Sequence, residues 1–179
     1  MAPSNLNQWL LQFCEWHDSF KRGTLPAEDT ELYMNGRHDL CGTLLMAQRL
    51  AIEPGAAARG ALRVARAYQI EFGFPVGAVT SITNDISTSG LSALVAESPP
   101  TGTVVWMRLK IGGGAVIVGR CQVVKIIPKQ GSILMGVAFE GLPVEAREKI
   151  ETVVCDVVVS ELRSTFRQRQ VQVAQSVVG

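Results

Sequence analysis

The fold is decided by residues 104–139, which read VVWMRLKIGGGAVIVGRCQVVKIIPKQGSILMGVAF. Three runs rich in β-branched and aliphatic residues lie at 104–111, 115–127 and 133–139. A glycine triplet separates the first two runs, and a Pro-Lys-Gln-Gly tetrapeptide separates the last two. Strand-like runs that are joined by short Gly- and Pro-rich turns, without helices between them, predict antiparallel strands in a barrel or a sandwich.

The residues before this stretch extend the β pattern. Further runs at 64–72, 79–86 and 91–96 bring the number of predicted strands to six. Partial closure of such a sheet would remove most of its exposed edges. Trp106 is expected to point into the core of this sheet, with a position beside a ligand as the alternative. The triplet at 112–114 is a hairpin turn and not a phosphate loop, because no Lys-Ser/Thr pair follows it.

A helix is predicted after the last strand. Leu142-Pro143 is a suitable start, because proline is favoured at the first helical position. The helical pattern fades from about Gln168, so residues 168–179 are expected to form a flexible tail. The apolar stripe of this helix has a period of 3.6 residues and consists of Ala146, Ile150, Val153, Val154, Val157, Val158, Leu162 and Phe166.

Residues 1–55 predict a helical hairpin in front of the β domain. Ser4 is the expected N-cap of the first helix and Gly23 its end. The stripe that this helix would bury is rich in aromatic residues and consists of Leu6, Trp9, Leu10, Phe13, Trp16, His17 and Phe20. This stripe either packs on the neighbouring domain or forms a dimer or partner interface, where aromatic residues are enriched.

The second helix of the hairpin is expected at about 29–50, and Pro54-Gly55 ends the region. Gly36 and Gly42 within this helix would allow the first helix to approach closely. The predicted organisation is therefore a hairpin at 1–55, a β domain with its C-terminal helix at 56–167, and a tail.

Composition excludes several classes of protein. The chain has 179 residues, of which 47% are hydrophobic, and a formal net charge of +1. This charge argues against a binder of DNA or RNA, which is usually basic on one face. No apolar run approaches the roughly 20 residues of a membrane span. The N-terminus has neither the charged nor the apolar region of a signal peptide, so a cytoplasmic location is expected.

Metal and redox chemistry are not expected. The cysteines at 14, 41, 121 and 155 form no CxxC pair, and reduced, mostly buried thiols are expected in a chain without a secretion signal. His17 and His38 lie in predicted helices, without a cysteine or carboxylate at metal-binding spacing. The sequence also has no G-x-S-x-G elbow, and no catalytic constellation is apparent.

The residues most suited to binding lie between 59 and 90. Arg59 and Arg63 directly precede the first predicted strand, and guanidinium groups bind phosphates in a bidentate fork and stack on purines. Asp85 can accept two parallel hydrogen bonds, which matches the N1–H and amine of guanine. Ser87, two residues further on, points to the same side of a strand, and Gly90 allows a left-handed turn. The alternative is that these residues bind no ligand, in which case Arg59 and Arg63 are solvated linker arginines and Asp85 and Ser87 belong to an ordinary turn at the end of a strand.

The arrangement resembles the PilZ domain family, bacterial receptors for cyclic di-GMP. The family pattern is RxxxR, then a strand, then D/NxSxxG, and both parts match here, as Arg59–Arg63 and as Asp85 to Gly90. The resemblance covers roughly residues 58–165. It implies a six-stranded antiparallel barrel with a C-terminal helix, with no cofactor and no metal. Ala58 stands where many members carry another arginine, which leaves open one cyclic di-GMP or an intercalated pair.

The resemblance also implies a role for each residue. Arg59 and Arg63 would wrap the phosphates and stack on guanine, Asp85 and Ser87 would read a guanine edge, and Gly90 would keep the turn open. The leading hypothesis is a non-enzymatic cyclic di-GMP receptor that signals through its N-terminal helices to a protein partner, and a homodimer is plausible. The alternatives are a ligand-independent adaptor that docks a partner through the hairpin, and a nucleotide hydrolase.

Overall fold

The computed structural model describes residues 5–51, 60–75 and 77–177, with side chains up to residue 166 and that of Gln168. The chain divides into two compact units. One consists of residues 57–154, and the other consists of residues 1–56 together with 155–179.

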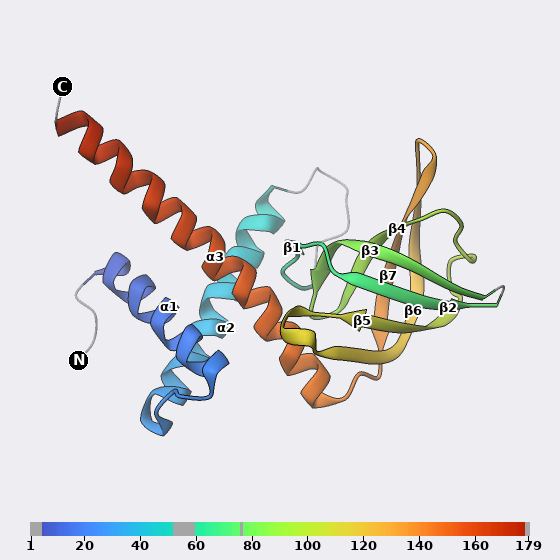
Figure 1. The fold of residues 1–179 in the computed structure, drawn as a ribbon, viewed down its shortest axis with the longest axis horizontal. Helices are drawn as coiled ribbons and strands as arrows, with labels where there is room; N and C mark the ends of the chain where they lie inside the picture. Colours follow the sequence, from blue (N-terminus) through green and yellow to red (C-terminus); the bar gives the residue numbers. More distant parts are fainter. Residues whose placement is uncertain (1–4, 52–59, 76, 178–179) are drawn as a thin grey trace. The chain divides into compact units, whose positions relative to one another are not determined.

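The first unit is a closed antiparallel β-barrel of six strands (Figure 1). The strands pair in the order β3-β2-β5-β6-β7-β4, and β4 pairs back with β3 to close the barrel. A two-residue strand, β1 (Val64–Ala65), adds to the outside of β3. The barrel strands are β2 (Gln69–Phe74), β3 (Gly77–Ser87), β4 (Gly90–Val95), β5 (Val104–Lys110), β6 (Val116–Lys129) and β7 (Ser132–Glu140). The prediction of a six-stranded antiparallel barrel is confirmed.

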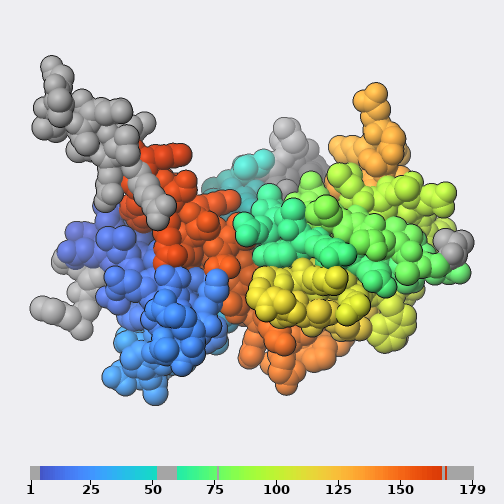
Figure 2. All heavy atoms as spheres, viewed as in Figure 1, coloured from blue at the N-terminus to red at the C-terminus, as the bar shows by residue number. Residues whose placement is uncertain are grey.

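The barrel core follows from the alternation of side chains along the strands. In β2 and β5 every second residue is buried, and these residues are aliphatic or aromatic. The predicted C-terminal helix is present as α3 (Val144–Val177), which begins directly after Pro143 and not with Pro143 as its first residue, and its first turns bury Ile150 and Val154 in the same unit. The β6–β7 hairpin stands out from the barrel surface (Figure 2).

Two expectations about the strands were wrong. The predicted strand at 64–72 is interrupted at 66–68, because Thr83 bonds this segment with its side chain. The Thr83 hydroxyl accepts from the Tyr68 amide at 2.9 Å and donates to the Arg66 carbonyl at 2.6 Å. Trp106 does not point into the core. It lies on the outward side of β5 with 60% of its surface exposed, and its Cβ would lie 3.6 Å from a Cβ added at Gly73.

The second unit contains helices α1 (Leu6–Arg22) and α2 (Ala27–Leu50) and the later part of α3. The N-cap of α1 is Asn5 and not Ser4, because the Asn5 side chain accepts from the Gln8 amide at 2.9 Å. Gly23 ends α1 in the left-handed conformation, as predicted, with φ 68°. Pro54-Gly55 lies outside the described residues.

The apolar stripe of α1 packs within the helical unit. Phe13 and Tyr33 are fully buried and stack on each other, and Cys14 of α1 with Cys155 and Val159 of α3 complete the cluster. Trp9 and Trp16, half-buried, pack against it. These two tryptophans of α1 therefore belong to the core of the helical unit.

Of the two helical glycines, Gly36 lies at a close helix approach and Gly42 does not. A Cβ atom at Gly36 would lie 3.1 Å from Trp9 Cζ2 and 3.3 Å from Phe13 Cδ2, whereas at Gly42 no atom lies within 4 Å. The expectation is confirmed for Gly36 and wrong for Gly42.

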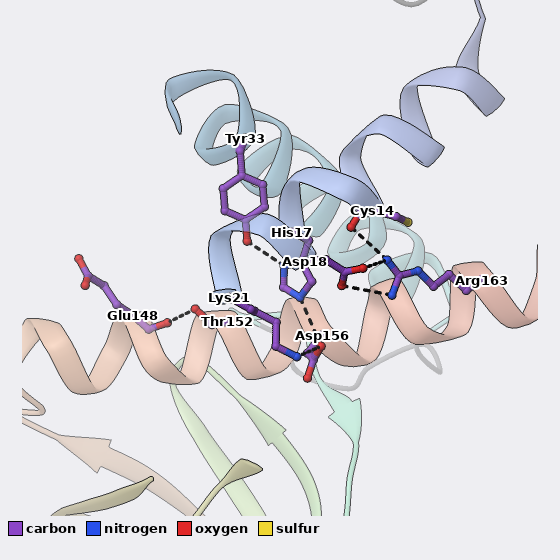
Figure 3. Close-up of polar contacts among 9 residues, drawn as sticks. All are labelled: Cys14, His17, Asp18, Lys21, Tyr33, Glu148, Thr152, Asp156 and Arg163. Atoms are coloured by element: carbon purple, nitrogen blue, oxygen red, sulfur yellow. Dashed lines mark hydrogen bonds and ion pairs between the residues drawn. The ribbon is translucent and has the colours of Figure 1, made fainter. Parts of the chain in front are cut away.

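A polar network joins α1, α2 and α3 inside this unit (Figure 3). The buried His17 ring contacts the Tyr33 hydroxyl at 2.8 Å through Nδ1 and an Asp156 oxygen at 3.4 Å through Nε2. Lys21 donates to the same oxygen at 2.6 Å. Burial lowers the pKa of His17 from its ordinary value of 6.5, against the opposing effect of Asp156. The network therefore holds a neutral histidine in the helical core at neutral pH.

A second ion pair fixes α3 on α1. Arg163 donates to the Asp18 carboxylate at 2.6 Å and to the Cys14 carbonyl at 3.1 Å (Figure 3). Its bond to Asp18 raises the pKa of Arg163. Beyond this pair α3 continues to Val177, past Gln168 where the helix was expected to end. Residues 168–177 contain neither glycine nor proline, which are the strongest helix breakers, and four of them are glutamine, which favours helix.

Among the described residues, no helix is long and apolar enough to span a membrane.

Candidate functional site

Asp85 is placed at the meeting point of three strands. It lies on β3 opposite Ala65 of β1 on one side and Ser92 of β4 on the other. The register of β3 against β4 shifts between Thr83 and Asp85, which is a β-bulge around Asn84. The bulge leaves the Asp85 side chain 22% exposed at the barrel surface. A partly exposed carboxylate on a rigid strand is well placed to accept hydrogen bonds from a ligand.

Arg63 lies beside Asp85. Its Nη1 is 3.4 Å from Asp85 Oδ1, and 41% of its side chain is exposed. The pairing of Val64 with Ile86 brings the residue directly before β1 to this position. Downstream of β1, Thr83 binds the segment at 66–68 and fixes the chain to β3. The structure therefore brings together a cation and an anion that the sequence analysis assigned to the same ligand. Arg59 lies outside the described residues.

Two further residues contact the Asp85 carboxylate. The Ser92 hydroxyl donates to Oδ2 at 2.6 Å, and the Asn84 amide donates to the same oxygen at 3.3 Å. Neither residue was singled out from the sequence. Asn84 adjoins Asp85 and could have been considered. Ser92 faces Asp85 only because of the β3–β4 register, which residue spacing does not reveal.

Ser87 and Gly90 close the turn between β3 and β4. Ser87 is fully buried, and its hydroxyl donates to the Gly90 carbonyl at 3.0 Å and accepts from the Ser89 amide at 3.4 Å. The Ser89 carbonyl accepts from the Phe139 amide at 2.9 Å, which ties the turn to β7. In this structure Ser87 therefore binds the turn itself.

Gly90 is needed for close approach and not for a left-handed turn. Its φ lies outside the left-handed region. A Cβ atom there would overlap the carbonyl oxygen of Val137 and lie 3.2 Å from Ala138 Cα. The reason given from the sequence for this glycine was therefore wrong, although the glycine itself is required.

A pocket of about 370 Å³ opens beside the same turn. It contains one exposed cation, Arg147, whose Nε donates to the Leu142 carbonyl at 3.2 Å. Its lining residues come from the turn, β7 and the region where α3 begins, and are Thr88, Ser89, Phe139, Leu142, Arg147 and Glu151. The barrel thus offers a recess next to residues 85–90.

The chemistry of this region is that of binding. Arg63 supplies a planar donor for phosphate or a purine face, and Asp85 supplies a two-oxygen acceptor for a base edge. Within the described ranges, no group of three or more histidine, cysteine or acidic side chains is placed to hold a metal ion.

Comparison with known proteins adds a family and a fold. A family model described as the PilZ domain matches residues 57–154. The PilZ domain of YcgR from Escherichia coli with c-di-GMP has a TM-score of 0.50 at 14% identity, over 62% of this chain and 98% of that one. The inhibitor of motility MotI/DgrA of Bacillus subtilis has a TM-score of 0.51 at 13% identity, over 60% of this chain and 53% of that one.

The MrkH–c-di-GMP complex of K. pneumonia has a TM-score of 0.54 at 13% identity, over 61% of this chain and 56% of that one. At these identities the likeness to all three structures shows the fold. The chain spans about half the length of MotI and of MrkH. No curated protein matches it.

Proposed function

Because the chain belongs to the PilZ domain family, which binds cyclic di-GMP as its ligand, we propose that it is a non-enzymatic cyclic di-GMP receptor. The observation that carries the proposal is the pairing of Arg63 with Asp85 at 3.4 Å on the barrel surface. The two groups have the chemistry that a guanine dinucleotide requires, a donor for phosphate and an acceptor for the guanine edge.

The proposed site consists of Arg59, Arg63, Asp85, Ser87 and Gly90. On binding, Arg63 exchanges the carboxylate of Asp85 for a ligand phosphate or a purine face, which releases Oδ1, so that the two carboxylate oxygens can accept from the N1–H and the amine of guanine. Ser87 and Gly90 maintain the tight turn and the close approach of β7 that hold Asp85 in place. Arg59 is assigned to the site from the family pattern alone.

The proposed output is a change in the helical unit. The chain passes between the two units at residue 56 and again at residue 154. Arg59 and Arg63 follow the first of these crossings, so ligand binding there would reorient the N-terminal helices. The receptor would then signal to a protein partner through α1 and α2, which expose several large apolar side chains, Leu6, Leu11, Leu32, Met46 and Leu50.

The proposal further includes a homodimer, action in the cytoplasm and no binding to DNA or RNA. None of the four cysteines, which all lie within the described residues, forms a disulfide, and this suits a reducing compartment. The family model that matches the chain is that of a cyclic di-GMP-binding domain, and the net charge of +1 gives no basis for a nucleic-acid partner. Light scattering measures the molecular mass directly and decides between monomer and dimer.

Titration calorimetry tests the proposed ligand. Cyclic di-GMP and cyclic di-AMP are titrated into the wild type, Asp85→Ala and Asp39→Ala, the last of which removes an exposed carboxylate from α2. We expect saturable binding of cyclic di-GMP, weaker binding of cyclic di-AMP, a loss of at least about tenfold in Asp85→Ala, and no change in Asp39→Ala. Absence of binding by the wild type would overturn the receptor proposal and favour the adaptor, which needs no ligand.

Chromatography of the nucleotide after incubation separates a receptor from an enzyme. We expect cyclic di-GMP to be recovered unchanged. The appearance of a linear dinucleotide or GMP would show a hydrolase instead.

A further inference from the structure

We propose that Ser92 is a positioning residue of the dinucleotide site, which orients the Asp85 carboxylate toward the guanine edge. The inference rests on the proposed function and names a residue outside the RxxxR and D/NxSxxG patterns.

The geometry of Ser92 points to Asp85. Ser92 is 4% exposed on β4, and Asp85 is its partner in the β3–β4 register. Its hydroxyl donates to Asp85 Oδ2 at 2.6 Å. A serine hydroxyl has a single proton, so this bond uses its whole capacity as a donor. Ser92 therefore serves one acceptor, which is the carboxylate of the proposed site.

The carboxylate needs an orienting partner. The terminal torsion of an aspartate is broad, so an Asp85 side chain without partners would rotate in the partly exposed site. Recognition of guanine requires both oxygens in the plane of the base edge. Ser92 fixes Oδ2 from the buried side of the strand, while Oδ1 faces the exchangeable Arg63. Asn84 also donates to Oδ2, at the longer distance of 3.3 Å, and is exposed.

The bulge around Asn84 is what makes this pairing. Without the register shift between Thr83 and Asp85, the residue opposite Ser92 would be Asn84, since Thr83 pairs with Ala93. Asp85 would then lie one position out of register with the only buried hydroxyl that reaches it among the described contacts. The bulge and Ser92 therefore act together to present the carboxylate.

A purely structural role for Ser92 makes a different prediction. If the Ser92 hydroxyl only stabilised the sheet, its removal would lower the free energy of unfolding, and any change in ligand affinity would be the same with and without Asp85. If it acts through Asp85, its effect on binding disappears when Asp85 is absent, and the effect depends on the guanine amine. A double-mutant cycle measures the first property, and an inosine analogue measures the second.

The experiment uses the full chain and titration calorimetry with cyclic di-GMP and its inosine analogue, cyclic di-IMP. The variants are Ser92→Ala, Asp85→Ala and the double variant. Ser81→Ala is the matched control, because the Ser81 hydroxyl also lies between β3 and β4 but bonds the Leu94 carbonyl. Thermal unfolding of each variant verifies that it is folded.

We expect Ser92→Ala to weaken binding of cyclic di-GMP about tenfold, the effect of losing one hydrogen bond to a charged group. The preference for cyclic di-GMP over cyclic di-IMP should fall with it, and Ser92→Ala should have no further effect in the Asp85→Ala background. Ser81→Ala should bind like the wild type.

Two results would overturn the role of Ser92 and leave the receptor function standing. In the first, Ser92→Ala binds cyclic di-GMP as tightly as the wild type. In the second, Ser92→Ala lowers the affinity by the same factor whether or not Asp85 is present. A wild type that binds neither nucleotide would overturn the receptor function, and the inference about Ser92 with it.

Discussion

The Nη1 atom of Arg63 lies 3.4 Å from Oδ1 of Asp85, although 22 residues separate them in the chain. Both side chains are partly exposed, and an ion pair at a surface contributes little to stability. We therefore expect Arg63→Ala to change the free energy of unfolding by less than about 1 kcal/mol, as measured by urea denaturation. A larger loss would assign Arg63 a structural role in anchoring β1.

Gly90→Ala should be far more damaging. The new Cβ would overlap the Val137 carbonyl oxygen, so the paired strands β4 and β7 would have to separate. We expect a loss of about 3 kcal/mol or more in the free energy of unfolding.

The control for Gly90 is Gly73→Ala on β2, where the nearest atom to a new Cβ lies 3.6 Å away. This variant should stay within about 1 kcal/mol of the wild type, because alanine fits a strand better than glycine. Equal effects of the two substitutions would show that the close approach of β7 is not what requires glycine at position 90.

The two glycines of α2 should respond in opposite directions. Gly42→Ala meets no neighbour and should raise the free energy of unfolding by up to about 1 kcal/mol, the propensity difference in a helix. Gly36→Ala would press on Phe13, which is fully buried and stacked on Tyr33, and should lower it by about 1–2 kcal/mol. Denaturant melts of both variants measure this difference. A gain from Gly36→Ala would contradict the tight contact of α1 with α2.

His17 should make the protein less stable in mild acid. Because burial lowers its pKa in the folded state, the unfolded chain binds a proton at His17 where the folded chain does not. The contribution of His17 is complete above its ordinary pKa of 6.5 and is lost as the pH falls through the folded pKa. We expect a slope of up to about 1.4 kcal/mol per pH unit below pH 6.5.

Asp156 titrates in a more acidic range and does not obscure this window. Burial alone would raise the pKa of Asp156, but Lys21 and His17 outweigh that effect and lower it below its ordinary value of 3.8. Urea melts between pH 5 and pH 8 measure the slope, and the exposed His38 provides the control variant His38→Gln. A slope that is the same at pH 5–6 and at pH 7–8 would contradict a neutral, buried His17.

Local patterns predicted the elements well, and long-range pairing explains the rest. The runs from Val104 to Phe139 predicted β5, β6 and β7, because turn residues and the alternation of side chains are local properties of the sequence. The bulge around Asn84, the partnership of Ser92 with Asp85 and the approach of Val137 to Gly90 depend on the register of strands that are distant in sequence. Trp106 lies on the same side of β5 as Arg108 and Lys110, so the local alternation placed it outward, and the prediction was wrong because it followed the apolar character of tryptophan instead.

The measurement that tests the receptor function most directly is calorimetry of cyclic di-GMP with the wild type and Arg63→Ala. We predict saturable binding by the wild type and at least about a hundredfold loss in the variant, since Arg63 is proposed to contact the charged ligand directly. The stoichiometry also decides between one cyclic di-GMP and an intercalated pair. Equal binding by both proteins, or no binding by the wild type, would contradict the assignment of this barrel surface as a cyclic di-GMP site.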